Sequence, residues 1–270
     1  MAKIAMLIDL SKCMACRSCQ AACKEWNDLQ AETTTNRGTY ENPPDLSANT
    51  WTRITFREVA ASEGVHWLFF KEQCLHCGEA PCVKVCPTAA LKQNELGFVS
   101  FEEELCNGCA YCTSFCPFGI PRMNIVNRLT GAATASKCTL CQDRVTAGMA
   151  PACVKACPTG ALAFGSREEI IARAEERVQA LQAGRSASRP NASLYGTNIL
   201  GGLGVLYVLP EAPESYGLPR NPQVNLAFSS FWQDLLQPLG EVAIGATLVG
   251  LGINWVVSRR MARQKEAQDE

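Results

Sequence analysis

Cysteine is the residue type whose spacing in this sequence points to chemistry. The stretch from Cys106 to Pro117 reads CNGCAYCTSFCP, which is a C-x2-C-x2-C-x3-C-P run. Thiolates at this spacing hold a [4Fe–4S] cube, and the fourth cysteine of such a run ligates a neighbouring cube. The run therefore predicts iron–sulfur chemistry and a second cube close to the first.

The other cysteines extend this pattern, because all 16 of them fall into four groups of four that each contain a C-x2-C step. Lys24 stands where proline is usual after the first group, and the second and fourth groups have longer second gaps. Four ligands for each of four cubes use every cysteine, so the sequence predicts four [4Fe–4S] clusters. The groups are Cys13, Cys16, Cys19 and Cys23; Cys74, Cys77, Cys82 and Cys86; Cys106, Cys109, Cys112 and Cys116; and Cys138, Cys141, Cys153 and Cys157.

Zinc and disulfide bonds are the competing explanations for so many cysteines. Zinc accepts four cysteines, but zinc ribbons use two C-x2-C pairs and not triplets followed by Cys-Pro. Disulfide scaffolds are usually shorter chains, and they do not require C-x2-C groups. We therefore expect iron as the metal of all sixteen cysteines.

The exchange of the fourth cysteine predicts which groups share clusters. Only 19 residues separate the second and third groups, so these groups should form one compact two-cluster unit. The first and fourth groups should then pair around that unit. The predicted ligand sets are Cys13, Cys16, Cys19 and Cys157 for cluster 1; Cys138, Cys141, Cys153 and Cys23 for cluster 2; Cys74, Cys77, Cys82 and Cys116 for cluster 3; and Cys106, Cys109, Cys112 and Cys86 for cluster 4.

An internal repeat supports a duplicated unit. Residues 80–91 read APCVKVCPTAAL, and residues 150–162 read APACVKACPTGAL. In each copy the proline should end a short helix and turn the chain into a strand, expected at 89–91 and 161–164. We predict an α+β domain over residues 1–165, in which two ferredoxin-like two-cluster units are nested.

The segments between and after the groups have simpler expected roles. The cysteine-free residues 27–65 are expected to form a long surface insertion, followed by a buried strand at 65–70. Residues 166–184 predict an amphipathic helix, which begins with a Ser166–Glu169 capping box and packs on the cluster domain. The Gly-, Pro- and Ser-rich residues 185–234 are expected to run as an extended surface segment or linker.

Residues 235–258 predict one transmembrane helix, because no charged residue occurs from Val242 to Val257. The alternative is a buried helix of a soluble domain. Four basic residues open the tail, residues 259–270, which then turns acidic. The positive-inside rule places this tail in the cytoplasm and the cluster domain on the periplasmic side of the inner membrane. No export signal precedes Asp9, so we expect folded export with a partner that carries one.

Composition and motifs argue against other functions. A formal net charge of −1 gives no basic footprint for nucleic acid, and only two histidines are present, which disfavours a haem in this chain. No nucleophile–base pairing or phosphate loop is evident. We therefore expect a conductor of electrons and not a catalyst, with Lys24, Lys84 and Lys155 as candidates for tuning the clusters.

Over residues 3–165 the four motifs resemble the electron-transfer subunits of molybdenum and tungsten oxidoreductases. Further stretches look like the beta subunit of membrane-bound respiratory formate dehydrogenase. These are EWND at 25–28, YENPPDLSA at 40–48, the apolar run at 203–209, YGLP at 216–219 and the C-terminal hydrophobic helix.

This resemblance implies a heterotrimer, which could oligomerise further. Its catalytic alpha subunit holds a molybdenum or tungsten pterin centre, oxidises formate and brings the export signal, and its gamma subunit is a cytochrome b that reduces quinone. The resemblance also implies that electrons enter at cluster 1 and leave from cluster 4.

Two other functions stay open at this stage. The same relay could serve another catalytic partner, such as polysulfide, thiosulfate or dimethyl sulfoxide reductase or a membrane hydrogenase. The chain could also be a free ferredoxin-like carrier or a redox sensor, although a free carrier should lack a membrane helix.

Overall fold

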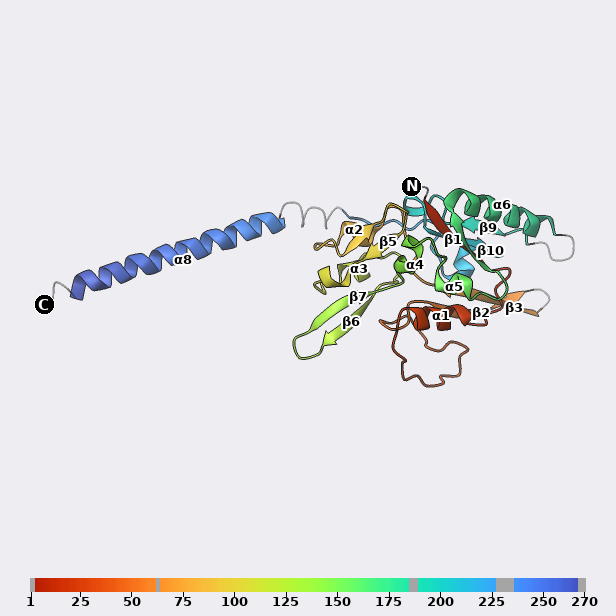
Figure 1. Cartoon of the computed structure of the whole chain (residues 1–270), viewed down its shortest axis with the longest axis horizontal. Coiled ribbons are helices and arrows are strands. Elements are labelled where there is room, and N and C mark those ends of the chain that lie inside the picture. Colours follow the sequence, from red (N-terminus) through yellow and green to blue (C-terminus); the bar gives the residue numbers. More distant parts are fainter. Residues whose placement is uncertain (1–2, 62–63, 185–188, 227–235, 267–270) are drawn as a thin grey trace. The chain divides into compact units, whose positions relative to one another are not determined.

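The computed structural model describes residues 3–61, 64–184, 189–226 and 236–266. The chain divides into two compact units, Met1–Val224 and Asn225–Glu270 (Figure 1). The first unit mixes short helices with strands, as expected for an α+β domain, and it contains all sixteen cysteines.

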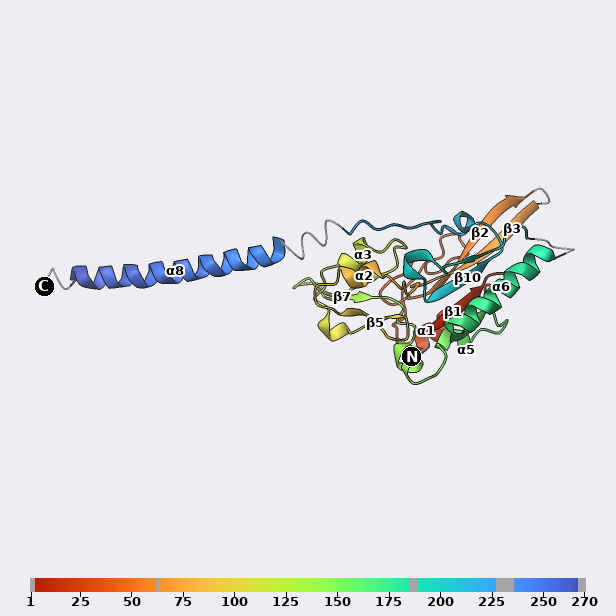
Figure 2. The same cartoon turned by 90° about the horizontal axis from the view of Figure 1, so that it is seen from above.

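A four-stranded sheet forms the centre of the first unit. In spatial order its strands are β8 (Leu162–Ser166), β1 (Ile4–Asp9), β10 (Val205–Leu209) and β9 (Ser193–Tyr195). β1 pairs parallel with β10 and antiparallel with β8. Helix α6 (Arg167–Ala183) follows β8 and packs against β1, β8 and β10, with Ile170 and Ala174 buried (Figure 2). Its predicted capping box between Ser166 and Glu169 is present.

The position of β10 corrects the expectation that residues 185–234 form a surface segment or linker. All five residues of β10 are buried, and the strand lies between β1 and β9 inside the sheet. An unbroken apolar run is typical of a strand that is covered on both faces. The domain that holds the cysteines therefore does not end at residue 165, because the first unit extends to Val224.

The predicted insertion at 27–65 is also only partly irregular. Within it, Arg53–Ala61 form strand β2, which pairs antiparallel with β3 (Gly64–Glu72). The predicted strand at 65–70 therefore forms, but its first residues are not buried. Val65 and Trp67 are exposed, whereas Leu68 and Phe70 belong to the core.

Short helices and hairpins hold the cysteine groups. Helix α1 packs on α5, and α2 packs on α3. The helices are α1 (Ser18–Trp26), α2 (Pro81–Lys84), α3 (Tyr111–Ser114), α4 (Gln142–Thr146) and α5 (Ala152–Lys155). The hairpins are β4 (Leu91–Gln93) with β5 (Val99–Phe101) and β6 (Arg122–Asn127) with β7 (Ala132–Ser136).

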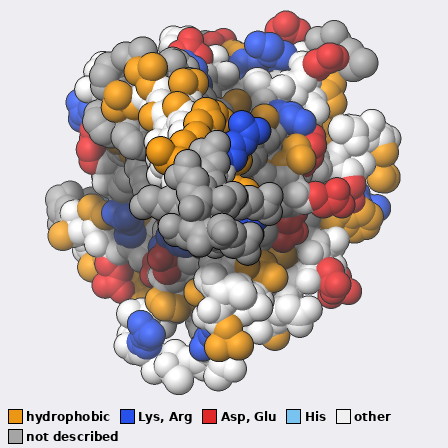
Figure 3. All heavy atoms as spheres, turned by 90° about the vertical axis from the view of Figure 1, so that its left-hand side faces the viewer, with side chains coloured by type: hydrophobic (Ala, Val, Ile, Leu, Met, Phe, Trp, Pro, Cys, Tyr) orange, Lys and Arg blue, Asp and Glu red, His pale blue; other side chains and the backbone are white. Residues whose placement is uncertain are grey.

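The described part of the second unit is one helix, α8 (Gln237–Glu266). Within it, Val242–Met261 is long and apolar enough to span a membrane, and this stretch is not buried in the structure. The face shown in Figure 3 carries hydrophobic side chains beside interspersed basic and acidic ones. Compared with the predicted span at 235–258, this candidate stretch begins and ends later, and residue 235 lies outside the described residues. The helix continues into the predicted tail as far as Glu266.

Candidate iron–sulfur cluster sites

The C-x2-C loops of all four groups share one backbone feature. The residue before the second cysteine has a left-handed φ in each loop: 55° at Ala15, 49° at His76, 75° at Gly108 and 59° at Leu140. Residues other than glycine adopt this conformation at a cost, and such strain persists where the surroundings enforce it, often at functional sites. In the fourth group the turn lets the Leu140 backbone N–H donate to Cys138 Sγ at 3.4 Å. The loops are therefore shaped around their sulfur atoms.

The predicted set of cluster 1 lies around one cavity. Cys13, Cys16, Cys19 and Cys157 line it, together with apolar residues of β1 and β8 and with Lys71. Burial raises the pKa of the Cys13 thiol, and the nearby Cys157 and Cys16 raise it further. The structure thus brings the last cysteine of the fourth group to the first three cysteines of the first group.

A second cavity is lined by the predicted set of cluster 2, which is Cys23, Cys138, Cys141 and Cys153. Asn27 Nδ2 donates to Cys23 Sγ at 3.6 Å, and burial raises the pKa of Cys138 to about 12. This set mirrors the first one, because here the first group provides its last cysteine to the fourth group.

Electrostatic effects on the thiol pKa values indicate that the cysteines of each of the remaining two sets also lie near one another. Burial raises the pKa of Cys77, and Cys74, Cys116 and Cys82 are the next contributors. Burial also raises the pKa of Cys112 to about 11, with Cys109, Cys106 and Cys86 as its charged neighbours. In both sets three cysteines from one group therefore meet the last cysteine of the other group.

The hairpin β6–β7 closes the loop of the third group. The Ala135 backbone N–H donates to Cys106 Sγ at 3.3 Å. Gly108 packs so closely on the hairpin that a Cβ there would lie 2.3 Å from the Ala133 carbonyl oxygen. The left-handed φ at this position favours glycine, but the other three loops hold Ala15, His76 and Leu140 at a similar φ. It is therefore the close approach of the two backbones that requires glycine here.

The geometry fits clusters better than single metal ions or disulfides. All sixteen cysteines are free. Among the residues that the structure describes, no three His, Cys, Asp or Glu side chains converge closely enough to hold one metal ion. Four cysteines that surround a cavity without meeting at a point suit a polynuclear cluster and not one tetrahedral zinc ion.

Comparison with known proteins identifies iron–sulfur domains in this part of the chain. A family described as a 4Fe-4S dicluster domain matches residues 65–167, and a second of the same description matches residues 12–90. The formate dehydrogenase iron-sulfur subunit of Haemophilus influenzae is 46% identical over 248 residues, which cover 90% of this chain and 77% of that protein. The iron-sulfur subunit of the nitrate-inducible formate dehydrogenase of Escherichia coli is 42% identical over 273 residues, which cover 100% of this chain and 89% of that protein.

The chain belongs to the iron–sulfur subunits of formate dehydrogenase. Its two dicluster domains provide for four [4Fe–4S] clusters, and the sixteen cysteines are present. The family places the chain in an oxidoreductase complex with a catalytic subunit, to which it contributes electron transfer. A further relative from Nitratidesulfovibrio vulgaris, 40% identical over 222 residues that cover 78% of this chain and 95% of that protein, is named formate dehydrogenase 2 subunit beta (cytochrome c-553).

The four sets of this formate dehydrogenase subunit differ in exposure. Cys16 in the set of cluster 1 and Cys109 in the set of cluster 4 are the exposed cysteines. All four cysteines in the set of cluster 2 are buried, and in the set of cluster 3 only Cys116 is half-buried. The sets of clusters 1 and 4 therefore reach the protein surface, while the other two are enclosed.

Electrostatic interactions between cysteines of different sets indicate that the four sets follow one another in a linear order. Cys19 interacts electrostatically with Cys153, which links the sets of clusters 1 and 2. Cys138 interacts with Cys74, which links the sets of clusters 2 and 3. Cys82 interacts with Cys112, which links the sets of clusters 3 and 4. The two sets that reach the surface thus lie at the two ends of the series.

The lysines suggested by the sequence do not point at sulfur. Lys24 Nζ donates to the Asn49 carbonyl oxygen at 2.7 Å and pairs with Glu32 at 3.3 Å. Lys84 and Lys155 are exposed to solvent.

Two other lysines, which sequence reasoning missed, are buried next to the cysteines: Lys71 is 1% exposed and Lys137 is 2% exposed. A signal for Lys71 was available, since it follows the apolar run before Cys74 directly. Lys137 immediately precedes Cys138. In both cases, however, burial depends on contacts that the sequence does not show.

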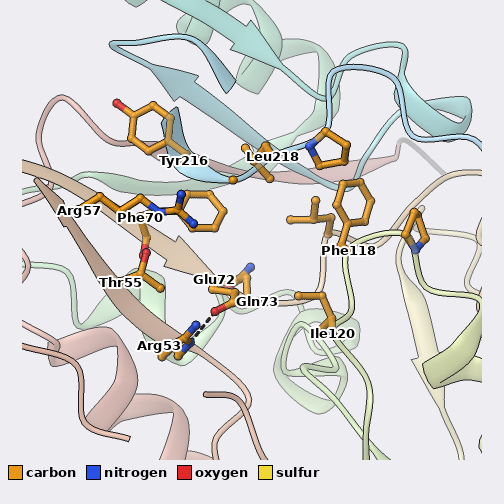
Figure 4. Close-up of a pocket in the computed structure, with 14 residues that line it drawn as sticks. Arg53, Thr55, Arg57, Phe70, Glu72, Gln73, Phe118, Ile120, Tyr216 and Leu218 are labelled. Carbon is orange, nitrogen blue, oxygen red and sulfur yellow. Dashed lines mark hydrogen bonds and ion pairs between the residues drawn. The ribbon is translucent and has the colours of Figure 1, made fainter. Parts of the chain in front are cut away.

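A separate pocket next to the β2–β3 hairpin contains no cysteine. Figure 4 shows Tyr216 and Leu218 next to Phe70 and Arg57, with Phe118 and Ile120 on the other side of the pocket. Arg53, which also lines the pocket, pairs with Glu72 at 2.5 Å. The pocket contains no nucleophile beside a base. It shows instead how the chain after β10 packs onto the hairpin.

Proposed function

We propose that this chain is the non-catalytic relay of a formate dehydrogenase. It passes electrons through four [4Fe–4S] clusters, from a catalytic subunit with a molybdenum or tungsten pterin centre to a membrane cytochrome b subunit and then to quinone. The linear order of the four cysteine sets, with the exposed cysteines Cys16 and Cys109 at its two ends, is the observation that supports a relay most directly.

We assign the ligands of the clusters as the four sets predicted from spacing. Cluster 1 takes Cys13, Cys16, Cys19 and Cys157; cluster 2 takes Cys138, Cys141, Cys153 and Cys23; cluster 3 takes Cys74, Cys77, Cys82 and Cys116; and cluster 4 takes Cys106, Cys109, Cys112 and Cys86. The packing of α1 on α5 and of α2 on α3 supports two nested ferredoxin-like units, because each pair joins the groups that exchange a cysteine.

Electrons enter at cluster 1 and leave from cluster 4 in this proposal. The surface around both end sets offers apolar side chains to partners. Met14 beside Cys16 is 61% exposed, and Leu105 and Tyr111 on either side of Cys109 are 42% and 39% exposed. Exposed apolar residues next to a redox centre suit docking of another subunit.

The membrane placement of the proposal depends on α8. Its candidate span carries exposed apolar side chains, and Arg259 and Arg260 lie near its C-terminal end. The positive-inside rule then puts the C-terminus in the cytoplasm and the cluster unit on the periplasmic side of a single-pass anchor in the inner membrane. The cytochrome c-553 in one relative's name makes a c-type cytochrome the alternative acceptor.

Purification of the complex with its membrane tests the proposal. The preparation should contain a large catalytic subunit and a cytochrome b, about sixteen irons per copy of this chain, by four irons to each of four cubes, and formate-dependent quinone reductase activity. Zinc in place of iron would refute the cluster assignment. Copurification with a subunit that reduces polysulfide or another substrate, without formate oxidation, would refute the proposed partner.

A further inference from the structure

Lys71 is a buried cation whose position the relay described above does not explain. It lies near the end of β3 and is 1% exposed. Its backbone carbonyl oxygen accepts a hydrogen bond from Tyr207 Oη at 2.7 Å, which fixes the strand to β10. Its Nζ donates to Thr52 Oγ1 at 2.8 Å and also to Gln73 Oε1. The ammonium group is therefore held at a defined place in the core.

That place lies between two of the cysteine sets. Lys71 lines the cavity that is surrounded by the set of cluster 1. Its two hydrogen-bond acceptors, Thr52 and Gln73, line the cavity that is surrounded by the set of cluster 2. The side chain thus forms part of the wall that separates the two cavities.

Within the described part of the chain, the charge of Lys71 has no carboxylate partner. None of the ion pairs among the described residues includes it. A hydroxyl and an amide satisfy hydrogen bonds but do not cancel a charge, and an unpaired buried ammonium is strongly unfavourable. Burial by itself lowers the pKa of Lys71, but the thiolates of Cys153, Cys19, Cys138 and Cys23 together raise it above its ordinary value. The compensating negative charge therefore comes from ligands of both sets.

We propose that Lys71 is the shared counter-charge of clusters 1 and 2 and raises the reduction potentials of both. The inference rests on the cluster assignment under the proposed function. Each step moves one electron from reduced cluster 1 to oxidised cluster 2, and Lys71 keeps its proton throughout. A fixed positive charge stabilises the added electron on either cube, because Coulomb interactions are strong in a low-dielectric interior.

The second buried lysine has a different position. Lys137 Nζ donates to the carbonyl oxygens of Val99 and Cys138 at 3.1 and 3.0 Å. Its charge lowers the pKa of Cys82, a ligand in the set of cluster 3, which burial otherwise raises. Lys71 is therefore the buried ammonium that faces the sets of clusters 1 and 2.

The test compares Lys71→Met and Lys71→Arg in the full chain within its purified complex. The matched control is Lys84→Met, which removes an exposed lysine two residues after a ligand. Iron content is measured first, and the four clusters are then titrated by redox potentiometry with electron paramagnetic resonance. In Lys71→Met we expect the equilibrium constant for reduction to fall at least tenfold for two of the four clusters, which lowers their reduction potentials by about 59 mV for one-electron couples. Lys71→Arg should stay close to the parent protein, and Lys84→Met should not change.

Each outcome decides the question. Unchanged potentials in Lys71→Met with full iron content, or an equal shift of all four clusters, would overturn the inference. If Lys71→Met loses iron while Lys71→Arg keeps it, the charge is required and the inference stands. Equal loss from both variants would show that the volume of the side chain matters and not its charge. A parent protein without four cubes would refute the cluster assignment itself.

Discussion

The substitution Cys109→Ser is expected to remove the last cluster of the proposed relay and to leave the other three. Cys109 is exposed, and it lies in a surface loop between Gly108 and Ala110, both of which have a left-handed φ. Because its side chain is not packed in the core, the substitution itself should change the free energy of unfolding by no more than about 0.5 kcal/mol. The loss should be confined to cluster 4, which lowers the iron content from about sixteen to about twelve per chain.

The assay separates the two halves of the reaction. Formate oxidation with artificial dyes should remain largely intact in Cys109→Ser, since the catalytic centre belongs to another subunit. Reduction of quinone should stop, since the proposed path leaves from cluster 4. Addition of formate should still reduce the three remaining clusters, which electron paramagnetic resonance can count.

Cys16→Ser is the matched control, because Cys16 is the exposed cysteine at the other end of the series. It should lose a similar amount of iron, about four atoms per chain, but it interrupts the path at its beginning. Formate should then leave the remaining three clusters oxidised, although dithionite still reduces them. If formate reduced the remaining clusters equally in both variants, the proposed order from cluster 1 to cluster 4 would be wrong.

Three further expectations follow from the structure. Gly108→Ala should lower the free energy of unfolding by more than the roughly 1–2 kcal/mol that a left-handed alanine costs, because its Cβ would lie 2.3 Å from a β7 carbonyl oxygen. Urea unfolding measures this change. The control is Gly119→Ala, where φ is +59° and the space is open, so that only the backbone cost remains. Burial raises the pKa of the Cys138 thiol from 9.0 to about 12 in the cluster-free fold. The neutral thiol therefore stabilises this fold fully below pH 9, and the free energy of unfolding should fall as the pH rises toward 12. A free energy of unfolding that does not change over this pH range would contradict the prediction. Leu251→Arg, at an exposed site within α8, should weaken membrane attachment by about 2.5–3.5 kcal/mol; unchanged resistance to carbonate extraction would argue against the span.

The sequence predicts the cysteine groups well because their ligand spacing is local. Each C-x2-C loop needs only a few neighbouring residues, and the exchange of the fourth cysteine follows from a general rule. The helix at 166–184 is predicted for the same reason, since Ser166, Glu169 and the apolar period all lie within the segment. Local patterns therefore carry most of the information about the cysteine sites.

The parts that the sequence does not predict depend on distant contacts. β10 pairs with β1, with Met6 opposite Val205, and the residues around 205 do not predict which strand they pair with. The Asn-, Thr- and Pro-rich stretch before β2 favours one continuous loop, and the prediction at 27–65 followed this composition. However, Arg53 to Arg57 alternates polar and apolar residues, which is typical of a strand. Lys71 is buried because it packs against Tyr207 and the cysteine sets, and these contacts are distant in the sequence.

The late strand β10 gives the cysteine-free part of the first unit a structural role in the relay. The backbone N–H groups of Gly204 and Val205 donate to the carbonyl oxygens of His76 and Leu75, inside the Cys74–Cys77 loop, at 2.8 and 3.1 Å. Tyr207 then holds Lys71 through its backbone. One segment therefore supports both the Cys74–Cys77 loop, which we assign to cluster 3, and Lys71, which we propose as the cation between clusters 1 and 2. Because these hydrogen bonds come from Tyr207 and Val205 of a fully buried strand and from the Gly204 before it, the fold holds in place the groups that would set cluster potentials in the proposed relay.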